Sequence, residues 1–321
     1  MIAPVLIISS LLFAGFQTST VTQPEPLSRF TYTQYHMGVD ARVTVYAKNE
    51  QAAEDACAAA FSRIAQLEAV MSDYRRDSEL MRLCDQAGGP SVKASLDLFK
   101  VLTRAREVSE RSNGAFDVTV GPLIQIWRPV RRSGTLPDLV EIRRAKLLVG
   151  WRNMNLDWAT KTVRLTRKGM RLDLGGIGKG YAADEAQRVL KKRGITRAMV
   201  ELGGDIVVSG PPPGTKGWTI RVPNAGDTQG PIDLQFANCG ISTSGDTEQF
   251  VVVNGVQYSH VVDPRTGMAL TNRIQATVVA KDGFTSDPLS TALTVIEPSQ
   301  RGRFLNYYKG AKVYLKTLAS K

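Results

Sequence analysis

The sequence predicts an α+β fold in which helices pack against one face of a largely antiparallel sheet. From Asp40 to Ala47, apolar and polar residues alternate with the period of a half-buried strand. From Ala53 to Leu67, apolar residues recur every three or four positions, as they do on one face of a helix. Between residues 198 and 280, short β-rich runs are divided by turn clusters. Long helices mixed with successive hairpins are typical of α+β proteins with antiparallel pairing.

The composition is that of an ordinary globular protein. The chain has 321 residues, 43% hydrophobic and 22% charged, which excludes the disordered, collagenous and disulfide-scaffold classes. This length allows one large domain or two lobes. The formal net charge of +11 favours anionic ligands such as phosphates, lipid head groups or nucleic acid. At most one disulfide can form, and no C-x-x-C pair of a zinc site occurs among Cys57, Cys84 and Cys239.

The N-terminal residues predict a leader. The first 24 residues carry no charged side chain, and the apolar run from Val5 to Phe16 is shorter than the ~20 residues that span a bilayer. We therefore expect residues 1–16 to be a signal-like leader or an anchor, and residues 17–28 to be a tether. The folded part should be 29–321. Phe16 stands where a lipoprotein box would have its cysteine.

Three helices have recognisable ends. The first should begin after Asn49, a suitable N-cap residue, and its apolar face places Cys57 in the core. The second should begin after Ser95 and end before Gly114, whose missing side chain suits a left-handed cap. The third should follow Gly180 and end at residue 194.

A basic segment lies between the second and third predicted helices, and strands are expected after it in the second half of the chain. The basic segment from Pro129 to Asp138 has no aromatic interleaving and no recognition motif, so we interpret its arginines as a solvated face and expect no nucleic-acid partner. The β-rich runs are Met199–Val208, Trp218–Val222, Ile232–Phe236, Phe250–Val253, Val256–Val262 and Ile274–Ala280.

A glycine-rich turn from Asp173 to Tyr181 follows a predicted strand and opens a helix. Its backbone amides and the helix N-terminus could bind an anion, and Lys179 favours a nucleotide phosphate. The turn is not a Walker A loop, because Asp173 occupies the first glycine position and Gly180 stands where Ser or Thr should follow the lysine. A tight strand-to-helix turn without a ligand is the alternative.

A polar cluster introduces the last apolar helix, with Pro288 expected in its first turn. Asp287 and Thr291 are four residues apart and can project from the same side of that helix. They would offer a carboxylate and a hydroxyl to one hard cation, for which magnesium fits better than zinc. Alternatively, Asp287 is simply the N-cap of the helix.

The chain has two histidines, His36 and His260, which are too few for a histidine-based metal cluster. His260 lies where a predicted strand runs into a turn at Asp263 and Pro264. A lone histidine in a strand is usually structural. Its ordinary pKa of about 6.5 nevertheless makes it the side chain best placed to take a proton at neutral pH.

Together these segments resemble the ApbE-type FAD:protein FMN transferases from Met37 to about Val295. Matches in five successive parts of the chain make the likeness specific. The resemblance implies a fold related to the T-fold, export to the cell envelope, and transfer of FMN from FAD to a protein hydroxyl. The matching stretches are Met71 to Leu80, Asn113 to Leu123, Asp173 to Asp184, Glu201 to Asp205 with Ser242 to Asp246, and His260 to Gly267 with Asp287 to Leu293.

The resemblance also implies site residues. Tyr74 would offer an aromatic face to a flavin or adenine ring, Asp173 would accept from sugar or ring N–H groups, and Lys179 would be a point charge for the diphosphate. Without the family, Tyr74 and Phe116 are equally well explained as core aromatics. The residues that match the FAD site are Met37, Tyr74, Ala115, Phe116, Asp117, Asp173 and Lys179. Those that match the Mg²⁺ site are Asp287, Thr291 and a backbone carbonyl near Gly176.

The reaction implied by the resemblance is displacement at the FMN-side phosphorus of FAD by a Ser or Thr hydroxyl of a partner flavoprotein. AMP would be released, Mg²⁺ would offset the charge of the diphosphate, and His260 is the candidate base. The expected acceptor is a flavoprotein subunit, such as one of a membrane redox complex. The expected location is the periplasm or the outer face of the cytoplasmic membrane.

Three positions depart from the family pattern, and two other functions stay open. Glu201 stands where an uncharged residue is usual, Cys84 replaces an asparagine, and Pro288 follows the metal aspartate. These departures concern the acceptor and the shape of the pocket more than the reaction. The alternatives are an FAD-binding carrier without turnover and a magnesium-dependent FAD pyrophosphatase that uses water.

Overall fold

The computed structural model describes residues 26–223, 230–245 and 250–317. The predicted leader at 1–16, most of the tether at 17–28, and Asp246 of the fourth matching stretch lie outside the described residues. None of the helices in the described ranges combines the length and the apolar character needed to cross a bilayer.

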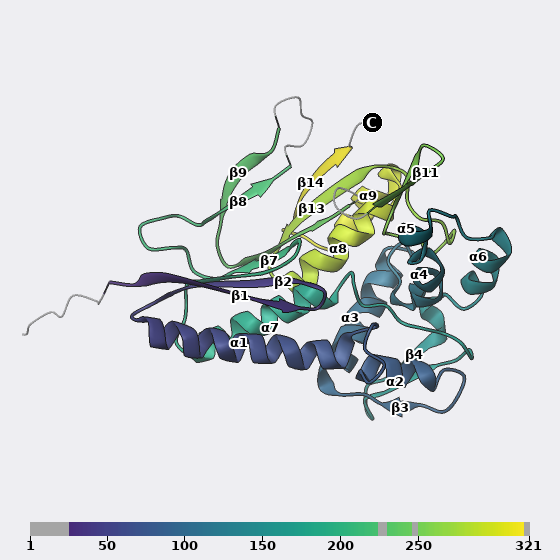
Figure 1. Cartoon of the computed structure of the whole chain (residues 1–321), viewed down its shortest axis with the longest axis horizontal. Coiled ribbons are helices and arrows are strands. Elements are labelled where there is room, and N and C mark those ends of the chain that lie inside the picture. Colours follow the sequence, from purple (N-terminus) through teal and green to yellow (C-terminus); the bar gives the residue numbers. More distant parts are fainter. Residues whose placement is uncertain (1–25, 224–229, 246–249, 318–321) are drawn as a thin grey trace, which may run out of the picture.

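The centre of the molecule is a seven-stranded sheet in which all neighbouring strands are antiparallel (Figure 1). The strand order is β1-β2-β6-β7-β10-β13-β14. This sheet confirms the predicted α+β class. Its strands are β1 (Ser28–His36), β2 (Val39–Ala47), β6 (Ala198–Leu202), β7 (Asp205–Val208), β10 (Cys239–Ser244), β13 (Ile274–Ala280) and β14 (Lys312–Thr317).

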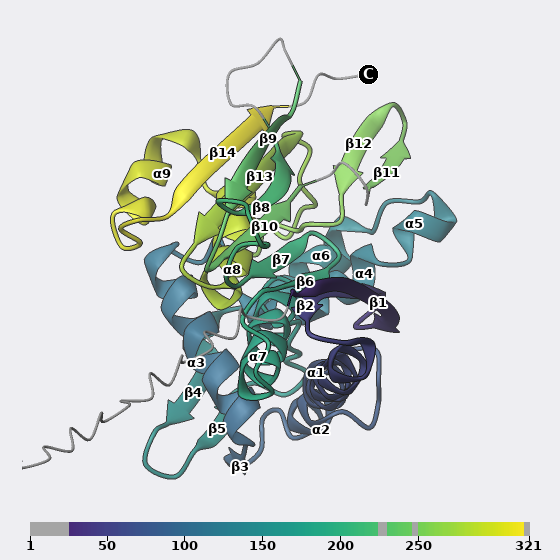
Figure 2. The same ribbon diagram turned by 90° about the vertical axis from the view of Figure 1, so that its left-hand side faces the viewer.

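Three helices cover one face of this sheet and a hairpin covers the other. α1 (Glu50–Met71), α7 (Gly178–Lys192) and α8 (Gly283–Val295) pack on the first face, while β8 (Trp218–Val222) and β9 (Ile232–Phe236) lie over the second (Figures 1 and 2). Because side chains alternate along a strand, Val207 of β7 joins the large core under the helices and Val208 joins the cluster under the hairpin. The central strands of the sheet are therefore buried on both sides.

The remaining elements pack around the sheet and its three helices. They include a second apolar cluster, in which α4 to α6 pack against β11 and β12. The indole N–H of Trp127 donates to the carbonyl oxygen of Gly267 (2.9 Å), which anchors the turn after β12 to α4. These elements are α2 (Glu79–Asp85), β3 (Val92–Lys93), α3 (Leu96–Arg111), α4 (Gly121–Trp127), α5 (Val130–Ser133), α6 (Leu139–Lys146), β4 (Met154–Asp157), β5 (Thr162–Leu165), β11 (Phe250–Val253), β12 (Val256–Ser259) and α9 (Pro298–Leu305).

The predicted helix starts are confirmed at two of three helices. The side chain of Asn49 accepts from the N–H of Ala52 (2.9 Å) at the start of α1, and Ser95 caps α3 in the same way. The third helix, α7, begins three residues earlier than expected, at Gly178 and not after Gly180. Cys57 is buried in the core, as predicted, and the three cysteines are unpaired.

Most predicted strands match the structure, and two need correction. The runs at 218–222, 232–236, 250–253 and 274–280 are strands with those bounds. The run from Met199 to Val208, in contrast, is a hairpin of β6 and β7, because Gly203 adopts a φ of 62° that turns the chain back. The run from Val256 ends as a strand at Ser259, before His260.

Candidate active site

Two helices meet at their N-terminal ends beside the central sheet. α7 follows the glycine-rich turn, and α8 follows β13. A Cβ atom on Gly180 would collide with the carbonyl oxygen of Gly283 and would lie 2.7 Å from the Cβ of Asp287. The two backbones therefore touch at this point, and only glycine fits there.

Asp287 is not the N-cap of its own helix, which corrects the alternative weighed above. α8 begins at Gly283 with Asp282 in the N-cap position, so Pro288 lies inside the helix and not in its first turn. The carboxylate of Asp287 is buried, and its Oδ2 accepts the backbone N–H of Gly180 in α7 (2.9 Å). Within the described part of the chain, its Oδ1 accepts no hydrogen bond.

The start of α8 is capped by a residue of α7 that the sequence did not single out. The two carboxylate oxygens of Asp184 accept the backbone N–H groups of Gly283 (2.9 Å) and Phe284 (2.8 Å). Only its position at the end of a matching stretch pointed to Asp184. Side chains from each helix thus satisfy backbone donors of the other.

Lys179 is held next to the same contact. Its ammonium group forms an ion pair with Asp205 of β7 (2.8 Å) and donates to the carbonyl oxygen of Gly175 (3.2 Å). Burial lowers the pKa of Lys179, but the nearby carboxylates of Asp205 and Asp287 outweigh burial, so the pKa is raised overall. Lys179 therefore carries a fixed positive charge at the glycine-rich turn.

The surroundings of Asp287, unlike those of Lys179, disfavour the charged form of the side chain. Its burial, together with the negative charge of Asp205, raises the pKa of the Asp287 carboxyl to about 7. The ammonium group of Lys179 and the N–H of Gly180 only partly offset this effect. A buried carboxylate with an unused oxygen and a raised pKa has a strong tendency to take up a cation.

The donors around Asp287 fit a magnesium ion. Thr291 lies one turn further along α8, and its hydroxyl is 3.1 Å from the hydroxyl of Ser244. A Cβ atom on Gly176 would come within 3.0 Å of the Thr291 oxygen, so the glycine leaves open the space beside it. In the described ranges no group of three or more His, Cys, Asp or Glu side chains is placed to hold a metal. An oxygen-rich site with few carboxylates matches the preference of Mg²⁺.

Tyr74 marks the opposite end of the candidate site, and it is not a core aromatic. Its side chain is 74% exposed, and the guanidinium carbon of Arg128 lies 4.1 Å from the centre of its ring. A nitrogen of Arg128 lies 2.6 Å from Asp73 and 3.6 Å from Asp173. Arg128 thus connects the neighbours Asp73 and Tyr74 with Asp173, which lies far along the chain. No sequence signal separated it from the other arginines around Pro129.

The carboxylate of Asp173 is fixed by the glycine-rich turn. Its Oδ1 accepts the backbone N–H of Gly175 (2.8 Å), while its own N–H donates to the carbonyl oxygen of Val118 (2.8 Å). Burial, and next the negative charge of Asp73, raise the pKa of Asp173 to about 6. The cations Arg128 and Lys179 act in the other direction.

The stretch from Ala115 to Asp117 is buried and supports the site from behind. Asp117 uses both carboxylate oxygens internally, accepting from Thr119 (2.8 and 2.7 Å) and from the backbone N–H of Trp151 (2.8 Å). Phe116 lies against the glycine-rich turn, 3.2 Å from the position that a Cβ on Gly176 would take. These side chains shape the turn from within the core.

Met37 reaches the same turn from the sheet. It adopts a φ of 52° in the two-residue turn between β1 and β2. Its methyl group lies 3.5 Å from the position that a Cβ on Gly178 would take, at the first residue of α7. Met37 therefore lies next to the N-terminus of α7, which the glycine-rich turn precedes.

His260 is exposed and lies directly after β12, not within a strand. The segment that follows it is tied to the end of α8. Arg265 donates to the carbonyl oxygen of Val295 (3.1 Å), and Asn272 donates to that of Thr294 (2.8 Å). The loop of His260 is thus anchored to the helix that carries Asp287 and Thr291.

Comparisons with known proteins show the family of this chain. The model of the ApbE family matches residues 37–315. A curated relative from Treponema pallidum (strain Nichols), named FAD:protein FMN transferase, is 31% identical over 291 residues, which cover 85% of this chain and 80% of the relative. One from Klebsiella pneumoniae (strain 342) with the same name is 30% identical over 267 residues, covering 82% and 81%.

Solved structures of similar proteins have the same fold. The apo form of the flavinyl transferase ApbE from Pseudomonas stutzeri superposes with a TM-score of 0.81 at 25% identity, covering 92% of each chain. The flavin transferase ApbE from Vibrio cholerae gives a TM-score of 0.81 at 26% identity, covering 92% of this chain and 98% of the other. The chain described here therefore belongs to the ApbE family.

Proposed function

We propose that the chain is an FAD:protein FMN transferase that moves FMN from FAD to a Ser or Thr hydroxyl of a flavoprotein and releases AMP. The names of its relatives support this activity. The single observation that carries the proposal is the meeting of α7 and α8. There a buried carboxylate, Asp287, and a half-buried ammonium group, Lys179, share the N-terminus of a helix that follows a glycine-rich turn.

The diphosphate of FAD would bind at the start of α7. Lys179 supplies a positive charge there, and the N-terminal end of α7 adds the positive end of the helix dipole. The exposed ring of Tyr74 offers a surface for a ring of FAD, and Asp173 offers acceptor oxygens next to it. Met37 and Phe116 pack behind the turn and hold its shape.

Asp287, Thr291 and a carbonyl near Gly176 would hold Mg²⁺. When bound, the ion supplies positive charge that offsets the charge of the diphosphate. The residues of the chain have separate tasks. Asp287 keeps an oxygen directed away from its bond to Gly180, and the hydroxyl of Thr291 lies beside the space that Gly176 leaves open.

His260 would act on the acceptor protein. Its side chain is exposed, so a hydroxyl of a second protein can reach it. A ring nitrogen takes the hydroxyl proton while the oxygen forms its bond to the FMN-side phosphorus, and the bond from that phosphorus to the AMP-side oxygen breaks. AMP leaves as a stabilised phosphate, so the site needs no strong general acid.

One incubation tests the proposed reaction against its rivals. The purified chain is mixed with FAD, Mg²⁺ and a candidate acceptor, and AMP is quantified while the acceptor is inspected for a fluorescent band after denaturing electrophoresis. Stoichiometric AMP and a labelled acceptor are expected. AMP without a labelled band would instead establish a pyrophosphatase, and bound FAD without AMP would establish a carrier.

We also propose that the protein acts in the periplasm or at the outer face of the cytoplasmic membrane, on a flavoprotein subunit such as one of a membrane redox complex. The uncharged, apolar start of the sequence supports export. Fusion of residues 1–28 to a reporter enzyme that is active only outside the cytoplasm tests this location. An inactive fusion, with the reporter recovered intact from the cytoplasm, would refute it.

A further inference from the structure

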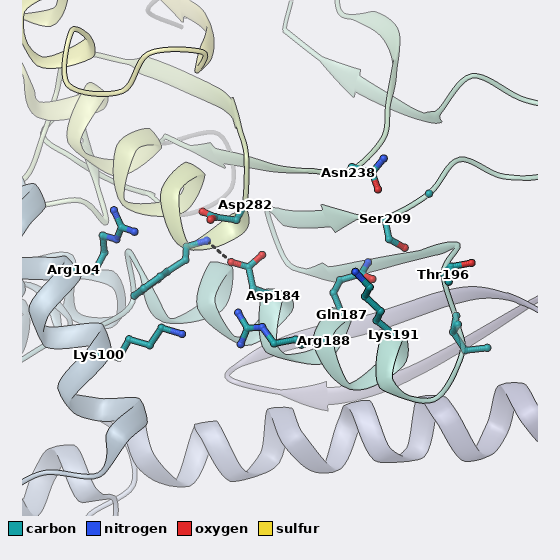
Figure 3. A pocket seen from close by; sticks show the side chains of 13 residues that line it. Lys100, Arg104, Asp184, Gln187, Arg188, Lys191, Thr196, Ser209, Asn238 and Asp282 are labelled. Carbon is teal, nitrogen blue, oxygen red and sulfur yellow. Dashed lines mark hydrogen bonds between the residues drawn. The ribbon is translucent and has the colours of Figure 1, made fainter.

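A second cavity lies away from the candidate site. It has a volume of about 600 Å³ and lies between α3, the second half of α7 and the start of α8 (Figure 3). The segments that follow α7 and β7 complete its wall. None of the residues predicted for FAD, Mg²⁺ or base catalysis lines it.

Four cationic side chains line this cavity. Lys100 and Arg104 project from α3, and Arg188 and Lys191 project from α7 (Figure 3). Burial, and next the positive charge of Arg188, lower the pKa of Lys100. Positive charges from two helices are therefore concentrated at one opening, and they repel each other.

The four cations do not each have a carboxylate of their own. Glu185 is shared by Arg188, by Lys100 (4.0 Å) and by Arg63 (2.9 Å), which lies on α1 outside the cavity. For Lys191, no ion pair is found in the described ranges.

Of the other carboxylates near the cavity, Glu107 and Asp184 are engaged or shared, whereas Asp282, which also lines the wall, has a buried Oδ1 without a hydrogen-bond partner among the described residues. The four cations still outnumber the two carboxylates of the lining. Glu107 is shared by Arg104 (3.3 Å) and Arg111 (2.6 Å). Asp184, which lines the wall, uses both oxygens to cap α8. Positive charge therefore remains available to a ligand.

Apart from the carboxylates of Asp184 and Asp282, the rest of the lining is apolar or uncharged. Phe284 and Ile195 are buried and form apolar wall. The amide nitrogen of Gln187 already donates to the carbonyl oxygens of Ala198 (3.0 Å) and Val207 (2.8 Å). An apolar wall under a cationic rim suits a molecule with an organic body and a phosphate group, because clustered Lys and Arg side chains match a dianion.

We propose that this cavity binds a small organic phosphomonoester. The phosphate lies among Lys100, Arg104, Arg188 and Lys191, and the organic part lies against Phe284. The site is separate from the FAD site and does not depend on the activity proposed above.

Calorimetric titration of the full chain with phenyl phosphate tests this site. Phenyl phosphate combines a dianion with one aromatic ring and has no feature specific to FAD. One-to-one binding is expected, with the same affinity when excess FAD is present, and with weaker affinity for inorganic phosphate. No binding, competition by FAD, or equal affinity for inorganic phosphate would overturn the proposal.

Matched variants locate the binding. Lys191→Gln should weaken the affinity for phenyl phosphate about tenfold, since a charge-assisted hydrogen bond is lost. Lys192→Gln removes the same charge from the next, exposed position, which does not line the cavity, and should leave the affinity within about twofold. Equal weakening by both variants would show general attraction to a basic surface and would refute the site. Arg104→Gln provides a second test from the opposite wall.

Discussion

Asp184 on α7 and Asp287 on α8 cap each other's helices. The carboxylate of Asp184 accepts from the first two residues of α8, and the carboxylate of Asp287 accepts from the third residue of α7. Each bond satisfies a backbone donor that a helix N-terminus leaves unpaired, and each negative charge lies at the positive end of a helix dipole. The geometry of the candidate site therefore depends on both carboxylates.

The free energy of unfolding should depend on pH through the carboxyl group of Asp184. Burial raises the pKa of Asp184 to about 6, although two backbone N–H bonds act against it. An unfolded aspartate titrates near about 3.9, so between these values the folded state holds more protons than the unfolded state. The free energy of unfolding should therefore fall by roughly 3 kcal/mol as the pH rises from about 4 to about 6.

Urea denaturation across this pH range checks the effect. Asp184→Asn should remove that part of the pH dependence, although the amide oxygen can keep only one of the two bonds to the N–H groups of α8. The exposed Glu54→Gln is the control and should leave the profile unchanged. A parallel shift of the Asp184→Asn profile with the same slope would contradict the prediction.

Asp287→Asn should reduce turnover by about two orders of magnitude or more, because the proposed magnesium ligand loses its charge. The amide oxygen can still accept from Gly180, so the fold should survive. AMP release at increasing Mg²⁺ concentrations measures the effect. Thr291→Val should raise the Mg²⁺ requirement, and Thr291→Ser, which keeps the hydroxyl, should not. If both Thr291 variants behaved alike, the hydroxyl would not be a ligand.

His260→Gln should suppress FMN transfer by about 10²-fold to 10⁴-fold while leaving the affinity for FAD nearly unchanged. The reason is that His260 is exposed on a loop beside α8 and is assigned only to the acceptor hydroxyl. Transfer is measured by acceptor fluorescence and FAD affinity by equilibrium titration. Equal losses in both would identify His260 as structural.

Tyr74 and Arg128 should act as a coupled pair in FAD binding. Tyr74→Ala removes the ring, and Arg128→Gln removes the guanidinium that contacts it and holds Asp73 and Asp173. Each single change should raise the dissociation constant for FAD severalfold. The dissociation constant of the double variant should be about threefold lower than the value expected if the two effects were independent. Dissociation constants for the three variants give this coupling. Arg131→Gln, on an exposed neighbour, is the control.

Gly180→Ala should destabilise the fold by at least about 3 kcal/mol, because the added methyl group would overlap the backbone of Gly283. Gly302→Ala is the matched control, since Gly302 also lies in a helix but has no atom within 4 Å of an added Cβ. That change should be neutral or stabilising by up to about 1 kcal/mol. Chemical denaturation distinguishes the two.

The sequence predicted those elements whose signals are local. The caps at Asn49 and Ser95 need only a side chain and the next helical turn, and both were correct. The strand β10 was missed because its residues from Cys239 to Ser244 are small and mostly polar. They form a central strand because neighbouring strands pair with both edges, which no local pattern records.

In the candidate site, too, local signals could be read from the sequence and long-range contacts could not. Asp287 and Thr291 were found because they are one helical turn apart. Arg128 was missed because its partners, Asp73 and Asp173, lie 45 or more positions away along the chain and approach it only in the folded state. Asp205 appeared only as part of a matching stretch, and its ion pair with Lys179 depends on how β7 lies beside α7.

The backbone contact between Gly180 and Gly283 limits how this protein can be re-engineered. Because neither partner has a side chain, no routine substitution adjusts the separation of the two helices in small steps. The separation of α7 and α8 is therefore fixed at this contact. Efforts to load a different dinucleotide should therefore diversify the outer surface around Tyr74, where new side chains leave the core packing intact.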